Sequence, residues 1–192
     1  MAKPKQKTVP TRFTVVIVDE QYDFCEKGAL AVNGGNKAVT QTCRFLRKNA
    51  ALIDRVVLTA DWHPSNHCSF VAQGGPWPPH CVQHSRGAAI HDRLMQTILK
   101  LGIPYEVVNK GSNPKMEEYG AFSVVPKRFA DKELWVMGIA GDYCVMETTI
   151  NLLKAKPRRL VLYGPGIASI DEAQFCKLLD EHTREYANLE IR

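Results

Sequence analysis

The sequence predicts an α/β protein, a single domain with three layers (α/β/α) and a mostly parallel sheet. Two observations carry this prediction. Short β-branched runs alternate along the chain with segments of helical periodicity, which is the pattern of a parallel sheet with helices on both faces. The chain has 192 residues, of which 45% are hydrophobic, and no linker rich in Pro, Ser or Gly divides it, so one sizeable core is expected.

The first half of this alternation begins with an apolar run, RFTVVIV, that predicts a strand at residues 12–18. A segment with helical periodicity follows at residues 36–52. The run RVVLTA predicts a second strand at residues 55–60, and a second periodic segment predicts a helix at residues 87–101. Residues 62–86, between the second strand and the second helix, show neither strand nor helix periodicity and are rich in Pro, Gly and His. We therefore expect a long functional loop there.

The second half repeats the pattern. PYEVVN predicts a strand at residues 104–109, and ELWVMGI predicts another at residues 133–139, which leads into a helix at residues 145–154. The run RLVLY predicts a strand at residues 159–163, and the last periodic segment predicts a helix at residues 171–186. The head of the chain, residues 1–11, is basic and punctuated by proline, so we expect a flexible arm before a domain at residues 12–192.

Composition and charge exclude several classes of protein. The net charge is +5, but four of the positive residues lie in the first twelve and the others are interleaved with acids, which indicates a solvated surface and no nucleic-acid partner. No apolar run has the length of a membrane span, and no signal peptide is recognisable. Six scattered cysteines form no CxxC pair, so we expect free thiols in a cytoplasmic protein.

Reactive residue types stand where the predicted strands end. Asp19 follows the first strand, Asp61 the second and Lys110 the third, and the fourth leads through a short turn to Cys144. Each alone has a plain structural interpretation, since an Asp there is a common turn former and a Lys a common surface charge. Ligands bind at the carboxyl edge of open parallel sheets, so together these residues predict a site.

The chemistry that needs a thiol, a carboxylate and a cation together is nucleophilic attack on an acyl carbon. Asp19 is the expected base and Lys110 the cation, and the helix that begins beside Cys144 is expected to lower the pKa of its thiol. Backbone N–H groups of Ala140 and Cys144 are candidates for an oxyanion hole. The alternative is that Cys144 is a small buried hydrophobe, as free cysteines often are.

The loop carries a second group of candidate residues. DWHPSNH and WPPHC bring Asp61, His63, His67 and His80 together, and one oxygen with three imidazole nitrogens suits zinc, iron or manganese. The alternative is a chance collection of surface histidines. Four prolines, at positions 64, 76, 78 and 79, favour the first interpretation because they would stiffen the loop.

Five blocks, in order over residues 12–165, resemble the nicotinamidases within the isochorismatase-like cysteine hydrolases. The blocks are VDEQYDFCEKGALAVNGG, TADWHPSNHCSF, WPPHCVQHSRGA, VNKGSNPKMEEYGAFS and GIAGDYCVMETTINLL. The resemblance implies a Rossmann-like fold and the deamidation of nicotinamide to nicotinate and ammonia through a Cys thioester, in NAD salvage. Pyrazinamide would be an alternative substrate, and one divalent metal ion, zinc above iron or manganese, would bind the ring nitrogen.

Carried over residue by residue, the resemblance implies a Cys, Asp and Lys triad at Asp19, Lys110 and Cys144. It implies metal ligands at Asp61, His63 and His80, with His67 at a position that binds metal in some members only. It also implies that Phe24 and Trp77 wall the substrate ring, and that the bond between Ile139 and Ala140 is cis. Glu20 and Gly120 depart from the residues usual in the family, and the chain beyond residue 165 is not matched.

Other functions stay open at this point. Relatives without metal cleave carbamoyl or ureido groups with the same triad, although Asp61, His63 and His80 argue against them. A non-catalytic metal-binding or redox-sensing module would use Cys144 as a sensor thiol. A homo-oligomer is one alternative for the state of assembly, which the sequence does not determine.

Overall fold

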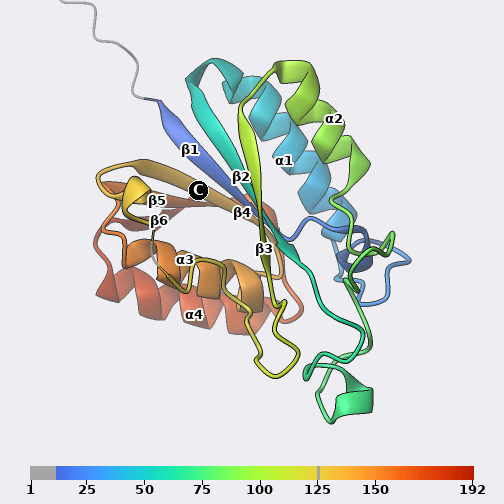
Figure 1. Ribbon diagram of the computed structural model, residues 1–192. Coiled ribbons are helices and arrows are strands. Elements are labelled where there is room, and N and C mark those ends of the chain that lie inside the picture. The colour runs from blue at the N-terminus through green and yellow to red at the C-terminus, as the bar shows by residue number, and fades with distance from the viewer. Residues whose placement is uncertain (1–11, 125) are drawn as a thin grey trace, which may run out of the picture.

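A computed structural model describes residues 12–124 and 126–192, so the arm expected at residues 1–11 lies outside the described residues. In this part of the chain six strands form one sheet in the order β3-β2-β1-β4-β5-β6, and every neighbouring pair is parallel. Helices α1 and α2 cover one face and α3 and α4 cover the other (Figure 1). The predicted three-layer α/β/α arrangement is confirmed.

The strands are β1 (Phe13–Val18), β2 (Ile53–Asp61), β3 (Tyr105–Lys110), β4 (Glu133–Ile139), β5 (Arg159–Ala168) and β6 (Leu189–Ile191). The α-helices are α1 (Gly35–Asn49), α2 (Asp92–Leu101), α3 (Met146–Leu153) and α4 (Glu172–Glu185). Within the described ranges, no helix combines the length and apolar character needed to cross a membrane.

The core lies on both sides of the central strand β1. Successive side chains of a strand point to opposite faces, so Val16 and Val18 pack toward α3 and α4 while Val15 and Ile17 pack toward α1 and α2. All four are fully buried. This two-sided burial explains why the first strand appears in the sequence as an unbroken apolar run.

The helix predicted at residues 87–101 is wrong in its first turn, because α2 begins at Asp92. Residues 87–91 instead lie beside the segment that follows β1. Backbone N–H groups of Tyr22 and Asp23 donate to the carbonyls of Ala89 and Gly87, and that of His91 donates to Glu20. These pairings between distant segments satisfy the backbone groups that a helix would otherwise have used.

The strand β6 was not predicted. Its three residues, Leu189–Ile191, form no apolar run long enough to be recognised, and they pair in parallel with Leu160, Val161 and Leu162 of β5 at the edge of the sheet. The last helix, α4, brings the chain back to this edge. Leu189 is buried beneath it, which makes the short strand part of the core.

Candidate active site

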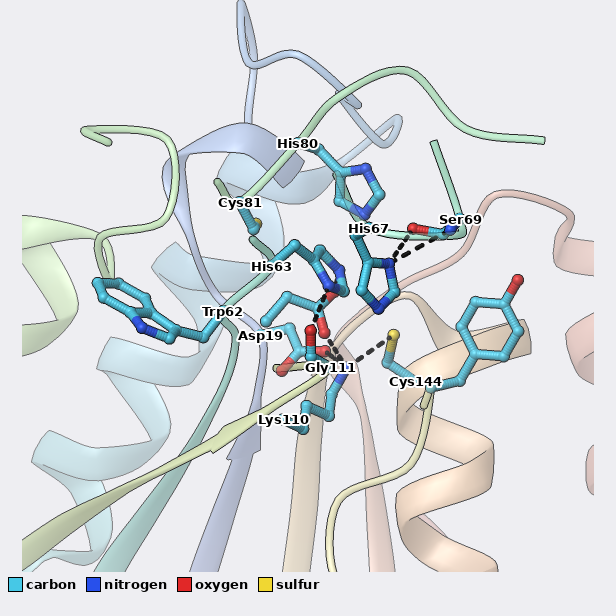
Figure 2. A network of polar contacts seen from close by, with 12 residues as sticks. Asp19, Trp62, His63, His67, Ser69, His80, Cys81, Lys110, Gly111 and Cys144 are labelled. Carbon is cyan, nitrogen blue, oxygen red and sulfur yellow. Dashed lines mark hydrogen bonds and ion pairs between the residues drawn. The ribbon is translucent and has the colours of Figure 1, made fainter. Parts of the chain in front are cut away.

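Three side chains from three strand ends meet at the carboxyl edge of the sheet (Figure 2). Asp19 follows β1, Lys110 is the last residue of β3, and Cys144 lies in the turn after β4. The Lys110 Nζ atom is 2.9 Å from Asp19 Oδ2 and 3.5 Å from Cys144 Sγ. The three residues are 0%, 3% and 6% exposed, in the order Asp19, Lys110, Cys144. The structure therefore brings together the three residues that the sequence selected.

Lys110 is held between two carboxylates. It pairs in register with Asp61 of the neighbouring strand β2, and its ammonium forms an ion pair with Asp61 as well as with Asp19. Thr59, also on β2, donates from Oγ1 to Asp19 Oδ1 at 2.6 Å. Two buried carboxylates thus share one buried ammonium, and a buried excess negative charge is costly unless a further cation compensates it.

Burial and these charges set the pKa values of the cluster. Burial raises the pKa of Asp19, although the Lys110 ammonium opposes the shift. Burial alone would lower the pKa of Lys110, but the carboxylates of Asp19 and Asp61 outweigh it and raise that pKa well above its usual value. Burial alone would raise the pKa of Asp61, as it does that of Asp19, but the charges and hydrogen bonds of Lys110 and His63 outweigh burial and lower this pKa. The ammonium stays charged, and Asp19 becomes a stronger base than a solvated carboxylate.

The low pKa expected for the Cys144 thiol is wrong. Burial raises the pKa of Cys144 well above its usual value, because the attraction of Lys110 is insufficient to offset desolvation and the nearby carboxylates. Cys144 lies in a π-helical turn, Gly141–Val145, ahead of α3. The thiol is therefore protonated at neutral pH and needs a base to take its proton.

Tertiary contacts fix the turn that carries Cys144. A Cβ atom at Gly141 would lie 2.4 Å from Ser169 Oγ, so only glycine allows the turn to approach the end of β5 this closely. The carboxylate of Asp142 accepts hydrogen bonds from the backbone N–H groups of Ile170 and Asp171, at 2.9 and 2.8 Å. These contacts join the turn to the segment that leads into α4.

The peptide bond between Ile139 and Ala140 is cis, as the resemblance implied. Ala140 and Cys144 both line the pocket above the triad. Their assignment as oxyanion donors stays a prediction.

Asp61, His63 and His80 form a group that fits a metal ion. One ligand atom from each residue lies within 4.8 Å of the others, and all three residues are buried. His63 Nδ1 is 2.9 Å from the carbonyl of Gly111, and His80 Nδ1 is 2.8 Å from that of Pro78. A ring N–H that donates to a carbonyl leaves Nε2 with its lone pair, which is the usual arrangement of metal-binding histidines. The ion would also supply the positive charge that the buried carboxylates lack.

His67 is placed differently from the other two histidines. Its Nδ1 is 2.6 Å from Ser69 Oγ and its Nε2 is 3.2 Å from the carbonyl of Met116. Both ring nitrogens therefore have protein partners, and the ring centroid lies 4.1 Å from that of His63 with the two planes tilted by 34°. Among the described residues, no candidate ligand group includes His67, so His67 as a ligand stays a prediction.

Cys144 of the triad and the candidate metal ligands Asp61, His63 and His80 line one pocket. Both predicted ring-wall residues, Phe24 and Trp77, line it. Aromatic side chains form much of the wall: Trp77 donates from Nε1 to the hydroxyl of Tyr119 at 3.0 Å and packs edge-on against Tyr143. A small, flat and mostly apolar ligand fits this shape.

Five residues of the pocket wall were missed by the sequence reasoning. They are Leu30, Glu117, Tyr119, Tyr143 and Ile170. Tyr143 directly precedes Cys144, and Glu117 and Tyr119 lie in a block already matched to the family, so nearness to those motifs was a usable signal. Ile170 had no such signal, because it lies outside the matched blocks and is held at the pocket by the hydrogen bond from its backbone N–H to the carboxylate of Asp142.

A comparison with protein families matches the isochorismatase domain to residues 13–156. The chain belongs to the isochorismatase family. It is 35% identical over 166 residues to the nicotinamidase of Escherichia coli, with 73% of this chain and 76% of that protein covered. The expected class of enzyme, a hydrolase that acts on an amide bond, is thereby confirmed.

Solved structures agree with this assignment. The crystal structure of PnC1 from L. infantum in complex with nicotinate has a TM-score of 0.81 and 31% identity, covering 96% of this chain and 93% of that one. The pyrazinamidase of Pyrococcus horikoshii, in complex with zinc, has a TM-score of 0.77 and 28% identity, covering 94% and 98%. The resemblance to nicotinamidases stated from the sequence blocks is confirmed.

Proposed function

We propose that this protein is a metal-dependent amidohydrolase that converts nicotinamide to nicotinate and ammonia in the cytoplasm, as a step of NAD salvage. The observation that carries the proposal is that Cys144, joined to Asp19 through Lys110, lines one aromatic pocket with the candidate metal ligands Asp61, His63 and His80. Its similarity to the nicotinamidase of Escherichia coli and to the L. infantum protein that binds nicotinate supports the choice of substrate.

The first half of the reaction forms a thioester. Asp19 takes the proton of the Cys144 thiol, and the ammonium of Lys110, 3.5 Å from the sulfur, stabilises the thiolate. The thiolate attacks the carboxamide carbon, and backbone N–H groups of Ala140 and Cys144 hold the negative oxygen. As the C–N bond breaks, Asp19 returns the proton to the leaving nitrogen and ammonia departs. The raised pKa of Asp19 suits both transfers.

The second half releases the acid. Asp19, again a carboxylate, takes a proton from a water molecule, and the oxygen of that water attacks the thioester carbon. The C–S bond then breaks, nicotinic acid forms, and the proton on Asp19 returns to the sulfur of Cys144. The acid releases its own proton to give nicotinate. The triad is restored without any net gain or loss of protons.

Asp61, His63 and His80 would hold the divalent ion. When bound, such an ion supplies a Lewis acid that takes the ring nitrogen and makes a bound water more acidic. Zinc suits the one carboxylate and two imidazoles, and iron or manganese would also accept them. The walls of Phe24 and Trp77 would keep the ring in the plane that presents its carboxamide to Cys144.

The proposal is tested by ammonia release from nicotinamide and from pyrazinamide, with the metal present, removed by chelation and added back as zinc, iron or manganese. We expect activity to follow one bound ion per chain. Benzamide keeps the carboxamide but lacks the ring nitrogen, so it should bind poorly to the loaded protein. Full activity in verified metal-free protein, or equal binding of benzamide and nicotinamide, would contradict the proposal.

A redox-sensing module is the less favoured alternative. Sensor thiols are exposed and have a low pKa, whereas Cys144 is buried and its pKa is raised. A metal-free amidase or ureidohydrolase of the same family is disfavoured by the ligand group at Asp61, His63 and His80. A homo-oligomer stays a prediction that size measurement in solution would test.

A further inference from the structure

The turn that follows β1 leaves the sheet earlier than its neighbour does. The last paired residues of the β1–β2 ladder are Val18 and Thr59, and the chain then bends at Asp19, which has a φ of 50°. The strand β2 continues two residues further, to Asp61. On the side facing β1, the backbone of Asp61 therefore has no strand residue to pair with.

The side chain of Gln21 takes the place of that missing strand residue. Its Oε1 accepts a hydrogen bond from the backbone N–H of Asp61 at 2.8 Å, and its Nε2 donates to the carbonyl of the same residue at 2.8 Å. The second N–H of the amide donates to the carbonyl of Ala88, also at 2.8 Å. Gln21 is fully buried, so this amide is committed to holding backbone, and chiefly that of a metal-binding residue.

Asp23, two residues further on, holds the other half of the metal-binding group. Its Oδ2 accepts from the backbone N–H of Cys81 at 2.7 Å, and its Oδ1 accepts from that of Ala29 at 3.1 Å. Cys81 directly follows His80, and its carbonyl accepts from the backbone N–H of His63 at 3.0 Å. One carboxylate thus holds Cys81, the residue that follows His80 and accepts a hydrogen bond from His63.

We propose that Gln21 and Asp23 are positioning residues for the metal ion, and that the turn at residues 19–24 aligns the metal with the catalytic base that it also carries. The inference rests on the proposed metal-dependent function. Neither side chain belongs to the ligand group, and both act through backbone. This turn thereby holds three groups that are far apart in the sequence: Asp19, Asp61 and the segment that contains His80.

The turn is built to keep this contact close. A Cβ atom at Gly87 would lie 2.0 Å from Asp23 Oδ2, so only glycine leaves space for the carboxylate. The backbone N–H of Asp23 donates to the carbonyl of the same Gly87 at 3.1 Å. The short segment before α2 therefore fixes the turn through its contacts with Asp23, and the hydrogen bonds of Gln21 fix the turn to the end of β2.

The test compares zinc affinity, measured by competition with a fluorescent chelator, in Gln21→Met, Asp23→Ala and Asp23→Asn. Methionine keeps the length of Gln21 but removes its donors and acceptor. We expect the Kd for zinc to rise about 10- to 100-fold in Gln21→Met and Asp23→Ala, as for outer partners of metal ligands. Asp23→Asn keeps one acceptor oxygen and should lose less. Saturating zinc should restore most of the turnover with nicotinamide.

Asn188→Ala is the matched control, because this side-chain amide also holds a backbone carbonyl, that of Pro157, at 2.7 Å. It lies beside β6, away from the site, so it should lower the unfolding temperature without changing the Kd for zinc. An equal loss of zinc affinity in Asn188→Ala would overturn the inference, since the effect would be general destabilisation.

Two further results are decisive. If the original protein binds one zinc and both Gln21→Met and Asp23→Ala bind it equally well, the inference fails and the proposed function stands. If the original protein binds no stoichiometric zinc, iron or manganese, both fail together. Should Gln21→Met not fold, the two Asp23 variants decide the question alone.

Discussion

The two halves of the site are supported in different ways. The triad stands on regular structure: Asp19 and Lys110 adjoin the ends of strands, and Cys144 lies in a turn continuous with α3. The metal-binding group has one residue on a strand, Asp61, and two on the long loop, His63 and His80. The loop contains no α-helix, and the side chain of Asp23 attaches it to the turn after β1, while that of Gln21 holds Asp61 at the end of β2.

This difference predicts what a substitution in each half of the site should change. Strand ends are fixed by the ladder and the core, so replacing a triad residue should remove chemistry while leaving the fold. The candidate loop ligands are held by a few hydrogen bonds and would be held further by a bound ion, so replacing one should lower metal binding, activity and stability together. The predictions below test this contrast, from the largest expected effect to the smallest.

The largest effect is expected in the triad. Cys144→Ala and Asp19→Ala should each lower kcat/KM for nicotinamide on the order of 1,000-fold or more. The kcat/KM of the double variant should be no lower than that of the less active single variant. Assays of ammonia release would measure this, with circular dichroism to confirm the fold. Cys176→Ala, at an exposed cysteine on α4, is the control that should keep normal activity. Near-normal turnover in Cys144→Ala would refute the nucleophile.

The metal half should show a coupled loss. His80→Ala should lower activity about 100-fold and abolish the stabilisation by zinc, which for a ligand at a hundredfold excess over its Kd is about 2.7 kcal/mol. Metal analysis, turnover and thermal unfolding with and without zinc are the measurements. His84→Asn is the matched control, four residues along the same loop and exposed. A His80→Ala variant that keeps its zinc would show that the loop is not the metal site.

Glu20 directly follows Asp19 in the chain and should make stability depend on pH. Its buried carboxyl contacts Thr42 Oγ1, and burial raises its pKa from 4.5 to about 8. Between these values the folded state binds more protons than the unfolded state, so the free energy of unfolding falls as pH rises. From pH 5 to pH 7 this group should remove about 2 to 3 kcal/mol.

Urea unfolding of the metal-free protein across this range measures the slope. Glu20→Gln, which is neutral at every pH, should lack this contribution and be the more stable of the two at pH 7. Equal slopes for the two proteins would show that Glu20 is not the titrating group.

The smallest effect concerns the pocket wall at Tyr119. The Nδ2 of Asn151 donates to the carbonyl of Ala121 at 2.9 Å, which attaches the segment after Tyr119 to α3. Asn151→Ala should lower the free energy of unfolding by about 1 kcal/mol and raise KM more than it lowers kcat. Lys154→Ala, which removes an exposed partner of Asn151, is the control and should change neither. A lowered kcat with unchanged KM would contradict this role.

The sequence by itself determined the layers, the strands that carry the site and the residues at their ends. Buried strands produce apolar runs, and runs of Val and Ile such as residues 12–18 are a local signal that no distant contact overrides. Parallel strands place their carboxyl ends at the same edge of a sheet, which is why Asp19, Asp61 and Lys110 could be expected at one edge from the sequence, whereas the order of the strands could not. The prediction held because each step used neighbours in the chain.

Only the tertiary structure decided the rest. The raised pKa of Cys144, the partners of His67, the support that Gln21 gives to Asp61 and the late start of α2 all depend on segments far apart in sequence. Burial and hydrogen bonding are properties of the assembled surroundings, and a residue's own neighbours in the chain do not specify them. A pattern can therefore place a thiol beside a helix, but its charge is set by the carboxylates and the desolvation that folding brings around it.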